Sequence, residues 1–105
     1  MIRGAVYRID LGEARRGHEQ RGRRYGLVLS PTDMDWGVAT IVPTSTQAQP
    51  AVFRPEIELG GVPTRFLVDQ LRSIDVRFVH DEPTFFLQRN ELEDVELAVA
   101  RYLGL

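Results

Sequence analysis

The stretch "AVYRIDLGEARRGHEQRGRRYGLVLS" (residues 5–30) holds the pattern that decides the fold. Residues 5–11 alternate between apolar and polar side chains, which is typical of a strand with one buried face. Residues 12–23 show no such period and contain three glycines, which indicates a loop. Residues 25–30 are again mostly apolar, as in a buried strand. The stretch therefore predicts two strands joined by a long loop.

This loop concentrates positive charge in a chain that is slightly acidic overall. Residues 15–24 contain five arginines, whereas the net charge of all 105 residues is −2. Residues 1–24 carry seven arginines against three carboxylates, a local charge of +4. Residues 81–105 carry two arginines against six carboxylates, a local charge of −4. This distribution excludes a uniformly basic nucleic-acid-binding surface and predicts one basic patch at the loop.

The rest of the chain adds short strands. Segments that alternate or are rich in β-branched residues predict strands at residues 38–45, 53–59 and 84–88. Residues 65–76 fit either one bent strand or two short ones. His80, in a charged stretch before a proline, is expected in a turn.

A C-terminal helix is predicted from its cap and its period. Asn90 and Glu93 have the spacing of a capping box at a helix start. Apolar residues then recur every three or four positions, at Leu92, Val95, Ala98, Val99, Tyr102 and Leu103. Short strands followed by one covering helix predict a β-rich α+β domain over residues 1–105, built as a small, strongly bent antiparallel sheet or barrel.

The composition removes several kinds of site. The chain has no cysteine, which excludes disulfides, thiolate metal sites and a cysteine nucleophile. Its two histidines are too few for a histidine-rich metal cage, and no metal or other cofactor is expected. No apolar stretch has the length of a membrane span, and residues 1–11 alternate where a signal peptide would be apolar, so a cytoplasmic protein is predicted.

Three groups of residues can carry chemistry. The arginine loop is a candidate, although charge runs are most often solvated surface; Arg24 differs because it directly precedes a buried apolar run. The hydroxyls of residues 44–46 are of a kind that most often caps turns, and no catalytic triad accompanies them, so a nucleophilic serine is not expected; a serine that positions or stabilises a phosphoryl oxygen is left open. Asp69 lies in apolar "FLVDQL" and needs a partner, which is either a structural arginine or part of a site.

Three ordered blocks resemble the MazF/Kid (PemK) family of toxin endoribonucleases. These blocks are "RGAVYRIDLGEARRGHEQRGRRYGLVLSP", "IVPTSTQ" and "VDQLRSID", and they span most of the chain. The resemblance implies an SH3-like barrel with a C-terminal helix that works as a homodimer. It also implies metal-independent cleavage of single-stranded RNA, which leaves 2′,3′-cyclic phosphate and 5′-hydroxyl ends, and inhibition by a MazE-like antitoxin.

The resemblance also assigns residues. It implies that Arg24 and Ser45 are catalytic, with His18 or Glu19 sharing the proton transfers. The substrate-binding residues it implies are Arg16, Thr46, Gln47, Phe53, Asp69 and Gln70. Two positions depart from the family pattern: Tyr25 stands where the family has proline, and Leu67 stands where Kid-like members have arginine.

Two other functions are compatible with the same fold. A CcdB-like gyrase poison binds a protein and needs no Arg24–Ser45 pair, while an inactive module would bind RNA or a partner without cleavage. The sequence leaves open the RNA cleavage motif, the cellular RNA target, the identity of the antitoxin, and which of Arg24, His18 and Glu19 moves the protons.

Overall fold

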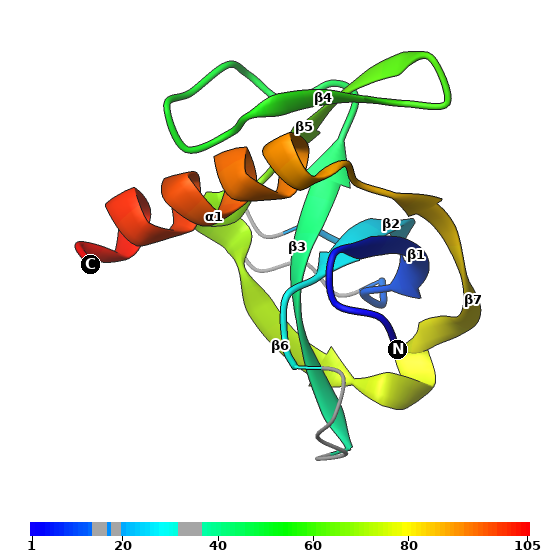
Figure 1. Cartoon of the computed structure of the whole chain (residues 1–105). Coiled ribbons are helices and arrows are strands. Elements are labelled where there is room, and N and C mark those ends of the chain that lie inside the picture. The colour runs from blue at the N-terminus through cyan, green and yellow to red at the C-terminus, as the bar shows by residue number, and fades with distance from the viewer. Residues whose placement is uncertain (14–16, 18–19, 32–36) are drawn as a thin grey trace.

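A curled antiparallel sheet with one C-terminal helix forms the described part of the fold (Figure 1). The computed structural model describes residues 1–13, 17, 20–31 and 37–105. The strands are β1 (Ala5–Asp10), β2 (Arg23–Val28), β3 (Val38–Ser45), β4 (Glu56–Leu59), β5 (Val62–Phe66), β6 (Arg72–Asp75) and β7 (Val79–Phe86). Two 3-10 turns, η1 (Val68–Gln70) and η2 (Val76–Phe78), lie between strands, and the helix α1 (Arg89–Leu103) follows them.

The seven strands form one curled sheet. The strands follow the order β4-β5-β3-β2-β1-β7, and every pair is antiparallel. The first half of β3 pairs with β6, while Thr44 and Ser45 at its end pair with β5. Strands β6, β3, β2, β1 and β7 pair in that order, so β6 and β7 are the edge strands of this part of the sheet. The turn η2 joins these two edge strands directly in the chain. The expected small, strongly twisted antiparallel sheet with a C-terminal helix is confirmed.

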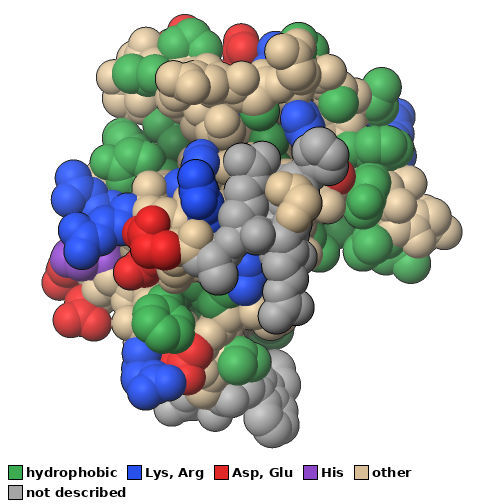
Figure 2. Space-filling view, turned by 180° about the vertical axis from the view of Figure 1, so that it is seen from behind, with side chains coloured by type: hydrophobic (Ala, Val, Ile, Leu, Met, Phe, Trp, Pro, Cys, Tyr) green, Lys and Arg blue, Asp and Glu red, His purple; other side chains and the backbone are tan. Residues whose placement is uncertain are grey.

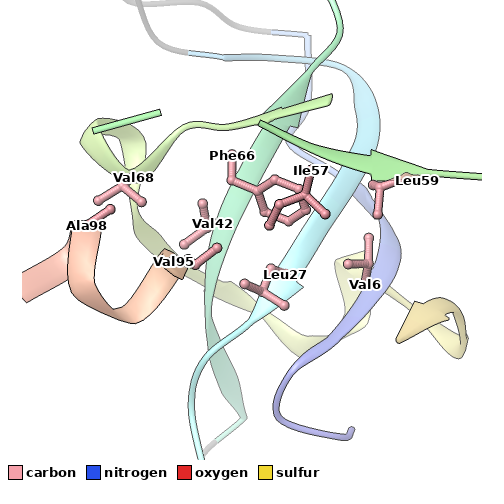
Figure 3. Packing of buried hydrophobic residues seen from close by; sticks show 9 residues of the cluster. All are labelled: Val6, Leu27, Val42, Ile57, Leu59, Phe66, Val68, Val95 and Ala98. Atoms are coloured by element: carbon pink, nitrogen blue, oxygen red, sulfur yellow. The ribbon is translucent and has the colours of Figure 1, made fainter. Parts of the chain in front are cut away.

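Two apolar clusters pack on the two faces of this sheet. Neighbours such as Val6 and Tyr7 belong to different clusters, because successive side chains of a strand point to opposite faces. The cluster under the helix is shown in Figure 3 and consists of Val6, Leu27, Val42, Ile57, Leu59, Phe66, Val68, Val95 and Ala98. The cluster on the other face consists of Ala5, Tyr7, Ile9, Val28, Ala39, Ile41, Ile74 and Val79.

Helix α1 covers the first cluster with its N-terminal turns. Ala98 lies beside Val68, and Val95 points toward Val42 (Figure 3). The last turn projects away from the sheet (Figure 1), and Tyr102 and Leu103 are 44% and 52% exposed. The predicted apolar face therefore packs on the cluster as far as Val99, and in the last turn the half-exposed Tyr102 ring contacts Phe53. Among the described residues, no helix combines the length and apolarity needed to cross a membrane.

The predicted start of the helix is wrong by two residues. The N-cap is Gln88, and the Glu91 side chain accepts a 2.8 Å hydrogen bond from the Gln88 backbone N–H. Leu87 and Leu92 then occupy the positions of a hydrophobic staple, and both pack against the cluster under the helix. Asn90, the predicted cap, is exposed within the first turn. The packing of the two leucines fixes which of the two similar cap patterns is used.

Several strand boundaries also differ from the prediction. Strand β7 begins at Val79, so His80 lies in a strand rather than in a turn. Residues 80–82 are polar and exposed, and their pairing with β1 has an irregular register, so the alternation that marks a strand is missing there. Residues 65–76 contain the end of β5, then η1 and β6, which agrees with the alternative of two short strands.

Gly26 allows a close contact between β1 and β2. A Cβ atom at this position would lie 2.6 Å from Cδ1 of Ile9, well inside normal contact distance. Ile9 pairs with Arg24 across the two strands and is buried in the second cluster. Because Gly26 has no side chain, Ile9 can pack against it on the face of the sheet that carries Arg24.

Candidate active site

Arg24 is held at the start of β2. Its Nε donates a 2.9 Å hydrogen bond to the carbonyl oxygen of Arg21, and its Nη1 donates a 3.3 Å bond to the carbonyl oxygen of Thr44. The side chain is partly buried. Its guanidinium therefore bridges the base of the arginine loop and the end of β3. These two hydrogen bonds attach the Arg24 side chain to the backbone on both sides.

Ser45 lies on the same face of the sheet as Arg24. Gly26 pairs with Pro43, and Arg24 and Ser45 are each two residues away from that pair, so they share its face. The Ser45 Oγ accepts a 3.1 Å hydrogen bond from the backbone N–H of Gln47. Since the hydroxyl acts as acceptor there, its proton can be donated to another group. A guanidinium and a hydroxyl donor thus stand at adjacent strand ends.

The neighbouring hydroxyls have different surroundings. Thr44 is buried, and its Oγ1 donates a 2.8 Å hydrogen bond to the carbonyl oxygen of Tyr25, which ties β3 to β2. Thr46 and Gln47 are exposed in the turn that follows β3. Thr44 is therefore structural, whereas Thr46 and Gln47 are accessible beside Ser45.

A second arginine, Arg65 of β5, lies across from Ser45. The two residues are directly paired, so their side chains share a face. Arg65 donates a 3.3 Å hydrogen bond to the carbonyl oxygen of Arg54 and lies 3.4 Å from a carboxylate oxygen of Glu56. These contacts direct it toward its own hairpin, where it offsets negative charge and supports the chain next to the site.

Asp69 is paired with an arginine, which is one of the two alternatives that its apolar surroundings left open. The Arg54 Nε and Nη2 donate hydrogen bonds of 3.0 and 2.8 Å to the two carboxylate oxygens. These bonds from Arg54 hold the pKa of Asp69 below its ordinary value, although burial acts in the opposite direction. Arg54 also donates a 3.2 Å bond to the carbonyl oxygen of Gln49. The pair therefore braces the turn that follows Ser45.

Gln70 connects η1 to the arginine loop. Its Oε1 accepts a 2.7 Å hydrogen bond from the backbone N–H of Gln20. At the base of the loop, Leu11 donates to the Gly22 carbonyl at 2.9 Å and Gly22 donates to the Gly12 carbonyl at 2.6 Å. The described ends of the loop are thus fixed both to β1 and β2 and to the segment that carries Asp69.

Comparison with known proteins identifies the family. Residues 2–103 match the family described as "PemK-like, MazF-like toxin of type II toxin-antitoxin system". The chain belongs to the PemK/MazF family of toxins. A Mycobacterium tuberculosis protein named as a candidate toxin is 64% identical over 105 residues, which cover 100% of this chain and 99% of that protein.

Solved structures agree with this assignment. MazF (Form-I) from Deinococcus radiodurans has a TM-score of 0.84 and 28% identity, with 98% of this chain and 96% of that chain covered. An endoribonuclease in complex with its cognate antitoxin, from Mycobacterial species, shares the fold with a TM-score of 0.81 at 18% identity, with 100% of this chain and 96% of that chain covered.

Three residues assigned from the PemK/MazF resemblance lie outside the described residues. They are Arg16, His18 and Glu19, so the structure does not test their predicted roles. Phe53 is described: its ring packs edge-to-face on Tyr102 with a centroid distance of 4.9 Å. Its predicted contact with a base stays a prediction.

The two departures from the PemK/MazF pattern have local explanations. The Tyr25 ring packs edge-to-face on Phe85 at 5.3 Å, and its carbonyl oxygen accepts the bond from Thr44, so it anchors the entry of β2. Leu67 is fully buried, and Arg54 supplies the guanidinium beside Asp69.

Sequence reasoning missed Arg54 and Arg65 as neighbours of the site. The apolar context of Asp69 predicted an arginine partner without indicating which one. The pairing of Ser45 with Arg65 depends on the register of β3 and β5, and no local pattern reports that register.

A basic cleft adjoins Arg24. It has a volume of about 580 Å³ and is lined by Arg8, Ile9, Asp10, Arg23, Arg24, Tyr25, Arg77, Phe78, Val79 and His80. Figure 2 shows arginine side chains gathered beside the histidine on this face, with carboxylates next to them. In the part of the chain that the structure describes, no three carboxylate or imidazole groups come together as they would around a metal ion.

Proposed function

We propose that this PemK/MazF-family toxin is an endoribonuclease that cleaves single-stranded RNA in the cytoplasm without a metal ion. The observation that carries the proposal is the placement of Arg24 and Ser45 at adjacent strand ends on one face of the sheet. The arginine-rich sequence of residues 15–24 and the basic cleft that Arg24 lines suit a polyanionic substrate.

The chemistry requires little from the protein, because RNA carries its own nucleophile. The 2′-oxygen loses its proton and attacks the adjacent phosphorus, and the bond from phosphorus to the 5′-oxygen breaks. The leaving oxygen takes up a proton, which yields a 2′,3′-cyclic phosphate and a 5′-hydroxyl end. Arg24 donates charge-assisted hydrogen bonds to the phosphoryl oxygens, and the Ser45 hydroxyl donates another.

The two proton transfers need groups other than Asp69. Both of its carboxylate oxygens accept bonds from Arg54, and its lowered pKa makes it a weak base. We assign these transfers to His18 or Glu19, with Arg24 as the alternative. A limb of the pH–rate profile that is absent in His18→Gln but present in Glu19→Gln would identify the histidine.

The partners proposed for this chain are a second copy of itself and a MazE-like antitoxin. Leu97 and Leu103 on α1 are 50% and 52% exposed, and exposed apolar side chains on a helix favour coverage by another surface. Light scattering at micromolar concentration should give twice the monomer mass. A stable monomer that cleaves RNA would exclude the homodimer as the active form.

The test of the function is cleavage of single-stranded RNA in excess EDTA, followed by mapping of the ends. The expected products are sequence-specific fragments with cyclic phosphate and 5′-hydroxyl termini. RNA binding without cleavage would indicate an inactive binding module. If the protein neither binds nor cleaves RNA but traps gyrase, the fold serves a CcdB-like poison instead.

A further inference from the structure

The cleft beside Arg24 extends away from Ser45, toward β7. Its walls come from β1, β2, η2 and the start of β7, and among the described residues neither Ser45 nor any residue of β3 lines it. Arg24 is the residue that the cleft shares with the candidate catalytic site.

The cleft is strongly basic for such a small space. Its lining contains four arginines, Arg8, Arg23, Arg24 and Arg77, against one carboxylate, Asp10. The Asp10 Oδ1 accepts a 2.8 Å hydrogen bond from the backbone N–H of Gly12, which occupies one of its oxygens within the protein. The excess of guanidinium groups in a concave surface favours binding of successive phosphates of a nucleic-acid strand.

The cleft also has a half-exposed aromatic ring in its lining. Phe78 is 49% exposed although it is a large apolar residue. The Arg77 guanidinium lies 5.8 Å from the centre of its ring, and the Arg8 guanidinium lies 6.0 Å from the centre of the Tyr25 ring. Exposed aromatic rings among arginines are the combination with which proteins hold single-stranded nucleic acids, by stacking and charge together.

The turn that carries Phe78 is held by contacts within the protein. Asp75 caps η2 by accepting a 2.8 Å hydrogen bond from the backbone N–H of Arg77, and the Arg77 Nε lies 3.1 Å from the same carboxylate oxygen. These contacts preorganise the turn η2, so RNA binding does not have to order it.

We propose that this cleft is an RNA subsite, in which Phe78 stacks on a base next to the cleavage point and Arg8, Arg23 and Arg77 bind the flanking phosphates. The proposal rests on the proposed ribonuclease function and names a site for substrate outside the Arg24–Ser45 pair. An acidic peptide would satisfy the arginines, but it would leave the Phe78 ring without a matching group. The observations therefore favour RNA.

The test compares two exposed phenylalanines of the same chain. Phe78→Ala is matched by Phe86→Ala, because Phe86 is 63% exposed on β7 and does not line the cleft. The probe is a uniformly 2′-O-methylated copy of an RNA that the wild-type protein cuts, so that binding is measured without cleavage. Loss of one stacked base should weaken binding about 5- to 100-fold in Phe78→Ala and leave Phe86→Ala unchanged.

Two further readouts separate a subsite from a loss of folding. The single-turnover cleavage rate at saturating enzyme should stay near the wild-type value in Phe78→Ala. Arg77→Gln should lower the slope of log affinity against log salt by about 0.7, the value of one phosphate contact to a single strand. Arg89→Gln is its control, since the Arg89 side chain is 94% exposed on α1.

The outcomes distinguish the two proposals. If the wild-type protein cleaves RNA but Phe78→Ala and Phe86→Ala bind the probe equally, the subsite is refuted and the ribonuclease is not. If Phe78→Ala weakens an acidic antitoxin-tail peptide and leaves RNA affinity unchanged, the cleft is a peptide site and the inference is wrong. If the wild-type protein neither binds nor cleaves RNA, the proposed function itself fails.

Discussion

Replacing Asp69 with asparagine should destabilise the protein in a pH-dependent way. The carboxylate accepts two charge-assisted bonds from Arg54, at 3.0 and 2.8 Å, and the two side chains are 26% and 21% exposed. Hydrogen bonds to charged groups contribute about 1.5–3 kcal/mol each when sheltered, and solvent-exposed pairs contribute less than about 1 kcal/mol. The stabilisation by this partly buried pair lies between those limits. Asp69→Asn should therefore lower the free energy of unfolding by about 1.5–2.5 kcal/mol at pH 7.

The pH dependence follows from the direction of the pKa shift. Because the pKa of Asp69 is lowered in the folded protein, its contribution is complete above the unfolded-state pKa of about 3.9. It is lost as the pH falls through the folded-state pKa. The stability difference between the wild type and Asp69→Asn should therefore be constant from pH 7 to about pH 5 and shrink below about pH 4.

Urea denaturation of both proteins at pH 7, 5 and 3 measures this difference. Glu93→Gln is the matched control, because the Arg89–Glu93 pair has side chains that are 94% and 62% exposed. It should change the free energy of unfolding by less than about 0.5 kcal/mol. A loss below about 0.5 kcal/mol in Asp69→Asn at pH 7, or a loss that persists unchanged at pH 3, would refute the structural role of the pair.

Three further predictions concern Gly26, the Ser45 hydroxyl and the arginine loop. Gly26→Ala should destabilise the fold by about 1–3 kcal/mol in thermal unfolding, because its Cβ meets Ile9; an unchanged melting temperature would contradict the close contact. Ser45→Ala should lower single-turnover cleavage about 10²–10³-fold while Ser45→Thr stays active, and equal activity of all three proteins would remove the hydroxyl from the mechanism. Replacing Arg15, Arg16 and Arg21 together should weaken binding of RNA and antitoxin and leave cleavage of bound RNA largely unchanged, and raising the salt concentration should weaken both interactions of the wild type; unaltered affinities in a titration of each would make the loop solvated surface.

Local sequence pattern was sufficient for the regular part of the fold. The alternation of residues 5–11 and the β-branched run at residues 38–45 correspond to β1 and β3. The charge of Asp69 in an apolar segment was sufficient to predict a partner for it, and a structural arginine was one of the two alternatives. These features depend on period and on desolvation, which act over a few residues.

Long-range features were not predictable in the same way. The register that sets Arg65 opposite Ser45 joins strands about twenty residues apart, and tertiary packing fixes it. The first part of β7 is charged on both faces, so the strand that brings Phe78 and His80 next to Arg24 gave no signal. The choice of Gln88 over Asn90 as the helix cap depends on the packing of Leu87 and Leu92 against the core.

The most direct test of the account is the single-turnover cleavage rate of Arg24→Ala on bound RNA in EDTA. Arg72→Ala is the control, because Arg72 is an exposed arginine on β6 that does not line the cleft. Loss of the guanidinium that stabilises the phosphoryl oxygens should lower the rate by about 10²–10³-fold or more, with the fold and the Arg72→Ala rate unchanged. If Arg24→Ala cleaves at a rate near that of the wild type, Arg24 and Ser45 are not the centre of the reaction.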